Sequence, residues 1–374
     1  VLKANGSLLI FRRAVASVSS DIRVQVILIA WLFETILEGI AGFGTPAAIA
    51  GPLLVVLGLS PMAAIVIALM GDSTAVSFGA LGTPLIIGIS GDAALISSVT
   101  WYTALLHFVG GTFVPLMMMV VLVRWHLKKD WSYVTEMIPF ALLAGLLFTV
   151  PFLITSLLGP ELPSVIGGIV GLGLAIYIVK RGWLLPKRKL ELHKKTKSPS
   201  KKKVYGAIAP YGLLVGLLLI SRSVVPLKEW LRSVIINVGV HSFEPLYNPG
   251  FYLCLVTIIV LMMDKKTEFS ETIWPTFGRI KGVVVPLLFT LWFVQLLSIS
   301  SENSLGLASM PLSMAALLPT HALTLFFVPF IGALGAFVTG SNTVSNLLFA
   351  DFQIALANSV GANQIIVLAM QVVG

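Results

Sequence analysis

Apolar runs of close to twenty residues recur along this chain, and they constrain its fold more than any other feature. A helix of about 20 apolar residues is long enough to cross a hydrocarbon core about 30 Å thick. The segments "WYTALLHFVGGTFVPLMMMVVLV" (101–123) and "IPFALLAGLLFTVPFLITSLL" (138–158) are two such runs. Strands of a membrane barrel alternate polar and apolar residues, and these runs do not. The sequence therefore predicts an all-α, polytopic membrane protein.

The composition agrees with this class, because 57% of the residues are hydrophobic and only 11% are charged, against about 25% charged in a soluble domain. The chain begins at Val1 and ends inside an apolar run at Gly374, so we expect a fragment that lacks both ends. We expect about 10–12 spans of membrane-crossing length. They fall within the segments 24–41, 45–59, 62–90 (broken), 99–123, 137–158, 162–179, 204–220, 247–263, 282–299, 312–338, 344–357 and 361–374.

The formal net charge of +9 comes from one polar segment. Residues 180–203, "KRGWLLPKRKLELHKKTKSPSKKK", contain eleven Lys and Arg residues and one acid, so the rest of the chain is nearly neutral. An excess of basic residues in a short loop is typical of the cytoplasmic side of a membrane. Because the basic charge is confined to one loop, it argues against a nucleic-acid partner. Contact of the loop with anionic lipid and simple solvation of the loop would each explain the basic residues.

The basic loop divides the chain into a first transmembrane half, 1–179, and an incomplete second half, 204–374. Each half contains a Gly-flanked polar break, a short helix, a glycine and another helix, as in "GFGTPAAIAGPLLVVLG" and "TGSNTVSNLLFADFQIALANSVG". Interrupted segments in corresponding positions of two halves are typical of transporters built from repeats, with the binding site at the repeat interface. We therefore expect two repeat-like halves whose discontinuous helices meet near the bilayer midplane.

Two acids, Glu34 and Glu38, occur in the apolar segment 24–41. Their spacing of four residues places both carboxyl groups on one helix face. A carboxyl group buried away from water favours its neutral form, and a second carboxyl nearby strengthens that preference. An ionisable group inside a membrane span is a candidate functional site. We predict Glu38 as the main proton-coupling residue and Glu34 as a second, although backbone amides freed at the following break would also explain a buried carboxylate.

An anion bound in the first half would meet no cationic side chain between residues 24 and 123, because that stretch contains neither Lys nor Arg. The start of a broken helix can bind an anion instead, since its free N–H groups and the helix dipole favour negative charge. Glycine lets the backbone approach a ligand closely, and Pro46 suits the first turn of the following helix. The sequence predicts substrate contacts from Gly42, Gly44 and Thr45.

Two further polar breaks carry candidate residues. The stretch "MGDSTAVSFGALGTP" (70–84) contains an acid, hydroxyls and a repeated Gly-Thr-Pro, and predicts Asp72 as a third proton-coupling residue with Ser73 and Thr74 as substrate contacts. A kinked packing helix rich in small residues is its structural alternative. Unpaired backbone is not tolerated in lipid, so the break in "GAFVTGSNTVSNLLFADFQ" (335–353) must face protein or a cavity. It predicts substrate contacts from Ser341, Asn342, Thr343 and Asn346.

Other residue types narrow the chemistry. His321 is a further candidate substrate contact, whereas His107 is more simply explained as a buried core histidine. The single cysteine, Cys254, allows no intramolecular disulfide. The sequence has neither a nucleotide-binding loop nor a metal-type Cys/His spacing or catalytic triad, so it predicts no cofactor, no metal and no enzyme. It leaves the oligomeric state open.

At these motifs the sequence resembles the lactate permease family, the proton-coupled transporters of L-lactate and related 2-hydroxy monocarboxylates such as glycolate. The resemblance rests on "WLFETILEGIAGFGTPAAI", "STAVSFGALGTPL" and "HALTLFFVPFIGALGAFVTGSNTVSNLLFADFQ". Where many members have Asn this chain has Asp72, and where many have Asp it has Asn342. An acid gained at one break and lost at the other preserves the local charge if the two positions meet in space.

The resemblance implies symport of L-lactate or a similar small 2-hydroxy monocarboxylate with H⁺ across the cytoplasmic membrane of a bacterium or archaeon. A Na⁺-coupled carboxylate carrier, with Asp72 and backbone carbonyls around the ion, is the first alternative. A channel and a membrane-embedded enzyme are less favoured ones. The residues alone do not distinguish the hydroxy acid, its isomer or the direction of flux.

Overall fold

The computed structural model describes residues 10, 13–14, 17–42, 45–89, 91–191, 199–238, 241–263, 269–318 and 321–374. This part of the chain is helical apart from one antiparallel pair of short strands, β1 (Ile236–Val238) and β2 (His241–Phe243). The predicted helical class is therefore confirmed, and the hairpin at 236–243 is its one departure among the described residues. The predicted repeat relationship between the halves remains a prediction.

The first half contains short and long helices, including π-helical (η1, η3) and 3-10 (η2, η4) segments. They are α2 (Ile22–Val26), η1 (Ile27–Phe33), α3 (Glu34–Ala41), α4 (Thr45–Val56), α5 (Pro61–Asp72), η2 (Ala75–Phe78), α6 (Gly79–Ile86), α7 (Ala93–Gly111), α8 (Val114–Val120), η3 (Val121–His126), α9 (Trp131–Thr135), α10 (Ile138–Thr155), η4 (Ser156–Leu158) and α11 (Pro163–Arg181).

In its described residues, the second half adds eight α-helices and two 3-10 segments. They are α12 (Lys201–Ser223), α13 (Val225–Ser233), α14 (Pro249–Met263), α15 (Phe269–Ser298), η5 (Ile299–Ser301), α16 (Met310–Ala316), η6 (Ala322–Phe327), α17 (Val328–Thr339), α18 (Asn342–Ser359) and α19 (Gln364–Val373).

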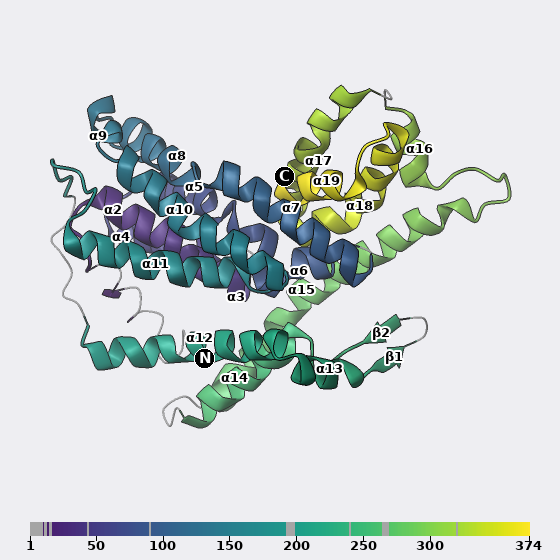
Figure 1. Ribbon diagram of the computed structural model, residues 1–374, viewed down its shortest axis with the longest axis horizontal. Helices are drawn as coiled ribbons and strands as arrows, with labels where there is room; N and C mark the ends of the chain where they lie inside the picture. The colour runs from purple at the N-terminus through teal and green to yellow at the C-terminus, as the bar shows by residue number, and fades with distance from the viewer. Residues whose placement is uncertain are drawn as a thin grey trace.

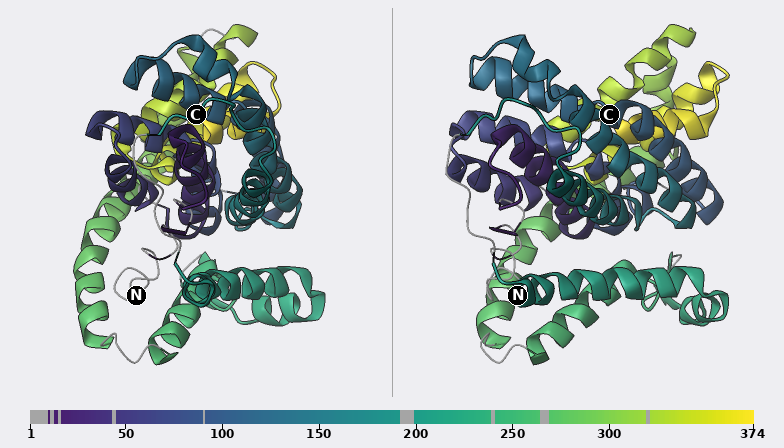
Figure 2. Two further views of the ribbon diagram at one scale, coloured as in Figure 1. Left: turned by 90° about the vertical axis from the view of Figure 1, so that its left-hand side faces the viewer. Right: turned by 60° about the vertical axis from the view of Figure 1, so that its left-hand side comes forward.

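The helices form a bundle with a separate arm. In Figure 1, α2 to α11 pack together, and α16 to α19 lie against one end of this bundle. There α19 packs on α7, and α18 contacts α6. Helices α12 to α14 lie below the bundle, and α15 runs from them toward α16, an arrangement that Figure 2 shows from two further sides. Leu81 and Val165 of the bundle join Leu214 and Val256 of the arm in one apolar cluster.

Five helices in the described residues are long and apolar enough to span a membrane, and the bent pair Pro61–Asp72 and Ala75–Ile86 makes six if it is one span. The five are Ile22–Ala41, Ala93–His126, Ile138–Leu158, Pro163–Arg181 and Val284–Ser301. The structure thus supports five or six of the roughly 10–12 expected spans in its described residues. The apolar stretches in the other expected segments are shorter, among them Gly212–Ser221, Gly250–Met263, Leu323–Thr339 and Gln364–Val373. In the most apolar window of Ile22–Ala41, 89% of the residues are buried inside the protein. Its acidic residues are thus enclosed by protein, which is how membrane proteins accommodate them.

The segment in which we expect a broken span, 62–90, is broken in the structure. Helices α5 and the η2–α6 pair meet at an angle of 53° around Ser73 and Thr74. A second irregularity follows in α6, where Ala80, Leu81 and Gly82 have φ values of 44°, 56° and 80°. Two successive non-glycine residues with left-handed backbone are strained, and such strain concentrates at functional sites. Both breaks border the cavity described next.

Candidate functional site

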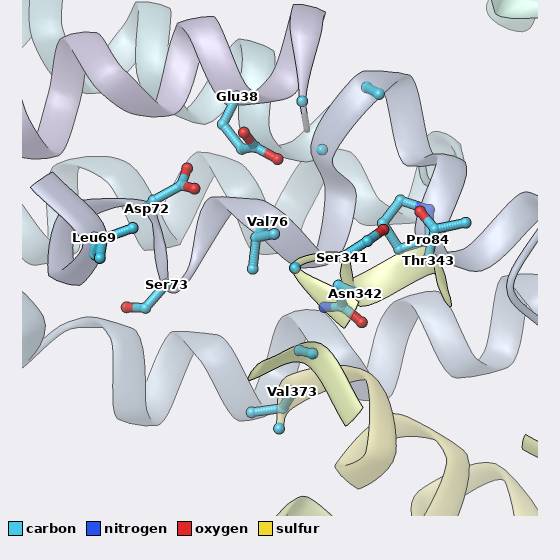
Figure 3. A pocket seen from close by; sticks show the side chains of 16 residues that line it. Glu38, Leu69, Asp72, Ser73, Val76, Pro84, Ser341, Asn342, Thr343 and Val373 are labelled. Atoms are coloured by element: carbon cyan, nitrogen blue, oxygen red, sulfur yellow. The ribbon is translucent and has the colours of Figure 1, made fainter. Parts of the chain in front are cut away.

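A cavity of about 340 Å³ lies where the broken helices of the first half meet the polar break of the second. This volume is at the lower end of the range for small-molecule sites, about 300–1,000 Å³. Figure 3 shows Glu38 and Asp72 on one side of it and the start of α18 on another. The cavity is lined by Glu38, Gly42, Leu69, Asp72, Ser73, Val76, Gly79, Ala80, Pro84, Ala336, Gly340, Ser341, Asn342, Thr343, Val373 and Gly374. Among the described residues, this lining includes no Lys, Arg or His.

The two carboxyl groups of the cavity form a pair. Glu38 and Asp72 are 1% and 8% exposed, and both line the cavity. Their side chains lie close enough to interact with each other. Oε2 of Glu38 and Oδ1 of Asp72 have no hydrogen-bond partner in the described part of the chain. The two residues therefore form a buried carboxyl pair whose free oxygens are available for further bonds.

The glycines of the sequence motifs make room for this pair. A side chain at Gly79 would overlap Oε1 of Glu38, so the carboxyl group occupies the space that the glycine leaves free. A side chain at Gly71 would overlap the carbonyl oxygen of Ala30. Helix α5 can pack this closely on the π-helical segment η1 only because position 71 is glycine, and this close packing brings Asp72 to Glu38.

Glu34 occupies a different position from Glu38, although both lie on the same helix face. Its side chain is fully buried, does not line the cavity, and has no hydrogen-bond partner for either oxygen among the described residues. A Cβ at Gly71 would come within 3.4 Å of Oε2 of Glu34. Asp72 and Glu38 lie close enough to interact electrostatically with it. Of the three predicted proton-coupling residues, two face the cavity and the third lies behind them.

The first polar break contributes one residue to the cavity wall. Helix α3 ends at Ala41 and is followed by Gly42, whose φ of 56° suits glycine. A Cβ at Gly42 would lie 2.7 Å from Cβ of Ala80. The two breaks of the first half thus touch each other at the cavity. Gly44 lies outside the described residues. Helix α4 begins at Thr45, whose side chain also lies outside the description.

The second polar break presents a helix N-terminus to the cavity. Helix α17 ends at Thr339, Gly340 follows with a φ of 70°, and Ser341 caps α18 by accepting a hydrogen bond from the N–H of Val344 at 3.4 Å. The first N–H groups of a helix have no partner within it and favour a negative charge. Asn342 and Thr343, which begin α18, line the cavity, so a partial positive charge faces the carboxyl pair.

The structure brings together some predicted substrate contacts and separates others. Ser73, Ser341, Asn342, Thr343 and Gly42 line the cavity. Thr74 is buried on the other side of its turn, against Gly111 of α7. Asn346 lies one turn further along α18, where its Nδ2 donates to the carbonyl of Pro84 at 3.0 Å. His321 is exposed and accepts a hydrogen bond from the N–H of Leu323 at 3.2 Å.

Asp72 and Asn342 are the two positions at which the resemblance implies an exchange of Asp and Asn. They lie in different halves of the chain, and both line the same cavity. The structure thus brings the two positions to one site.

Sequence reasoning missed a buried amide pair next to the site. Nε2 of Gln353 donates to Oε1 of Gln371 at 2.9 Å, Nε2 of Gln371 donates to Oγ of Ser345 at 3.1 Å, and Ser345 donates to the carbonyl of Gly332 at 2.9 Å. Gln353 follows Asn346 by seven residues, and this spacing places both on one helix face. This spacing is the sequence signal from which a second buried amide on the same face of α18 could have been predicted.

The sequence matches the family model described as L-lactate permease over residues 2–238 and 231–374. It is 28% identical to a putative L-lactate permease of Haemophilus influenzae, over 99% of this chain and 74% of that protein. It is 28% identical to the L-lactate permease of Escherichia coli K12, over 98% and 71%. It is 27% identical to the glycolate permease of the same strain, over 99% and 72%. No solved structure is significantly similar to it. In the described part of the chain, no group of three or more His, Cys, Asp and Glu side chains is arranged to hold a metal ion.

Proposed function

Because the chain belongs to the L-lactate permease family, we propose that it transports L-lactate or a related small 2-hydroxy monocarboxylate, such as glycolate, in symport with H⁺. The family consists of permeases rather than enzymes. The relatives named for lactate and for glycolate resemble this chain almost equally, which supports a small 2-hydroxy acid as the substrate class. The relatives are bacterial, and we place this protein in a cytoplasmic membrane.

One observation carries the proposal: a buried pair of carboxyl groups and a helix N-terminus line the same cavity. The N–H groups at the start of α18 supply a site for the substrate carboxylate, in a cavity whose described lining has no cationic side chain. The pair of Glu38 and Asp72 supplies a site for the proton. Hydroxyl groups of Ser341, Thr343 and Ser73 lie within the same lining and can bond the 2-hydroxyl group of the substrate.

Coupling follows from the charges. A carboxylate substrate that enters the cavity is repelled by an ionised pair and is better tolerated once the pair gains a proton. The substrate therefore raises the affinity of the pair for a proton, and the proton raises the affinity for substrate by the same factor. The anion and the proton then cross the membrane together, and their charges cancel. Glu34 is buried behind the pair, and in this proposal it exchanges a proton with the pair on the side away from the substrate.

The test is lactate-driven alkalinisation of the medium around proteoliposomes, comparing wild type with Glu38→Gln. The wild type should take up lactate and protons together, and the variant should lose the proton movement. Glu302→Gln is the matched control, because Glu302 is an exposed carboxyl group outside the cavity lining. Replacing Na⁺ by choline at fixed pH separates H⁺ coupling from the Na⁺-coupled alternative. Unchanged coupled uptake by Glu38→Gln would remove Glu38 from the mechanism.

The second part of the proposal concerns the side of the membrane on which the basic loop, 180–203, lies. We place this loop in the cytoplasm because of its eleven basic residues. The expected span 204–220 separates this loop from Glu229, which we therefore place outside. Single cysteines introduced at Lys189 and at Glu229, in a Cys254→Ser background, should react with an impermeant maleimide from opposite sides of the membrane. Labelling of both from the same side would contradict this topology.

A further inference from the structure

A buried hydrogen-bonded chain lies directly behind the cavity wall. Oγ of Ser77 in η2 lies 2.7 Å from Nε2 of His107 in α7, and donates to the carbonyl oxygen of Val372 in α19 at 3.1 Å. The side-chain amide of Asn342 donates to the same carbonyl oxygen at 2.9 Å. The carbonyl of Val372 thus accepts one hydrogen bond from each half of the polypeptide.

The directions of these bonds follow from the available protons. A serine hydroxyl has one proton to donate, and Ser77 uses it toward Val372. Ser77 must then accept its bond from His107, so Nε2 of that imidazole carries a hydrogen. Asn342 donates to the same carbonyl through Nδ2. The chain runs from His107 through Ser77 to Val372, and Asn342 joins it from the other side.

The surroundings exclude water from this chain. Ser77 and Val372 are fully buried, and His107 is 5% exposed. The His107 ring packs edge-on against Phe152 with the ring centroids 5.9 Å apart, and Phe152 in turn packs against Phe78 at 5.0 Å. Hydrogen bonds are stronger in such a medium, and an unpaired group there is correspondingly costly. Water cannot replace a lost member of the chain.

The chain is attached to the cavity lining next to Ser77, next to Val372 and at Asn342. Val76 and Gly79 line the cavity on either side of Ser77, Val373 follows Val372, and Asn342 is itself a lining residue. Ser77 and His107 do not line the cavity, so any effect they have on a substrate must act through their neighbours. The observed geometry lets them hold the wall in place.

From this arrangement we infer that His107 and Ser77 are positioning residues for the carboxylate site. They fix the carbonyl of Val372, and this carbonyl orients the Asn342 side chain at the N-terminus of α18, where the substrate carboxylate binds. This inference rests on the proposed function, because it assigns the two residues to the same site. It gives His107 a role different from proton transfer, since its Nε2 hydrogen points to Ser77 and not to the carboxyl pair.

The test measures the concentration dependence of lactate counterflow for Ser77→Ala and His107→Leu. Each removes one member of the chain, and loss of one buried hydrogen bond should raise KM on the order of tenfold with little change in the maximal rate. His107→Gln keeps a donor near the position of Nε2 and should restore a KM close to wild type. The KM of the double variant should be no higher than that of either single variant, because the two residues act as one unit.

Thr103→Val is the matched control. Thr103 is fully buried one turn before His107 on α7, and its hydroxyl has no hydrogen-bond partner in the described part of the chain, so this variant should keep a wild-type KM. Wild-type KM values in Ser77→Ala and His107→Leu would overturn the inference. So would failure of both proteins and of His107→Gln to accumulate while Thr103→Val accumulates, because that pattern shows a purely structural role. Absence of lactate counterflow in the wild type would instead overturn the proposed function itself.

Discussion

Asn346 on α18 donates its side-chain amide to the carbonyl of Pro84 on α6 at 3.0 Å, and this bond joins the polar break of the second half to the broken helix of the first. The contact is close, because a Cβ at Gly88 would lie 2.7 Å from Cβ of Asn346. The two elements that carry the cavity are thus held together directly beside it.

Replacing Asn346 by Leu should weaken this junction. The variant leaves the buried Pro84 carbonyl without its side-chain donor, which should lower the free energy of unfolding by about 1–3 kcal/mol. Thermal unfolding of the purified protein in detergent measures the effect. Asn358→Leu on the same helix is the control, since Asn358 is exposed and bonds only the exposed Gln364 among its described partners. Equal shifts in Tm for the two variants would contradict the account.

Gly79 should be essential for the geometry of the carboxyl pair. Its substitution by Ala places a methyl group on Oε1 of Glu38 and should displace that carboxyl from Asp72. We expect proton-coupled uptake to fall by more than tenfold while the protein still accumulates, since overpacking costs about 1–3 kcal/mol. Gly110→Ala, where nothing lies within 4 Å of the added carbon, should transport normally. Normal coupled uptake by Gly79→Ala would show that the pair does not depend on this contact.

Glu34 should act on the proton and not on the substrate, because it is buried behind the pair and does not line the cavity. Glu34→Gln should therefore keep lactate–lactate exchange within about twofold of wild type, whereas uphill uptake driven by a pH gradient should fall about tenfold, the effect of about 1.4 kcal/mol. Comparing the two assays on the same proteoliposomes makes the distinction. Equal loss of exchange and of uphill uptake would assign Glu34 to the substrate site.

The buried Arg23 should contribute more to the free energy of unfolding than the exposed Arg232 does. It is fully buried at the start of α2, where it pairs with Asp21 at 2.7 Å. Arg23→Met leaves a buried carboxylate unpaired and should cost about 3–5 kcal/mol. Arg232→Gln breaks an exposed pair with Glu244 and should cost at most about 1 kcal/mol. Thermal unfolding of both variants tests this ranking, and similar Tm values would contradict it.

Local sequence patterns predict the helical class and some of the individual helices, although only five or six of the roughly 10–12 expected spans form long apolar helices in the described residues. The run of apolar residues predicts a span over 99–123, and the structure has one over Ala93–His126. The polar stretch 70–84 predicts a break, and the chain bends there by 53°. These features depend on neighbouring residues, whose apolar length and glycine or proline content are visible in the sequence.

The site is less visible in the sequence, because its contacts join distant segments. The spacing of Glu34 and Glu38 correctly places both on one helix face, but only the packing of α5 at Gly71 decides that Glu38, and not Glu34, faces the cavity with Asp72. His321 resembles a site residue in the sequence and lies at the surface. Whether a polar side chain meets a ligand or a backbone carbonyl depends on tertiary packing, which local patterns do not encode.

The most direct test of the central claim is proton uptake on binding. Purified protein in weakly buffered detergent solution, with a pH indicator, is mixed with lactate at neutral pH. If the pair of Glu38 and Asp72 gains a proton when the anion enters the cavity, the wild type takes up protons in proportion to the lactate bound, and Glu38→Gln takes up none. Lactate binding without proton uptake in the wild type, or equal uptake in Glu38→Gln, would contradict the account.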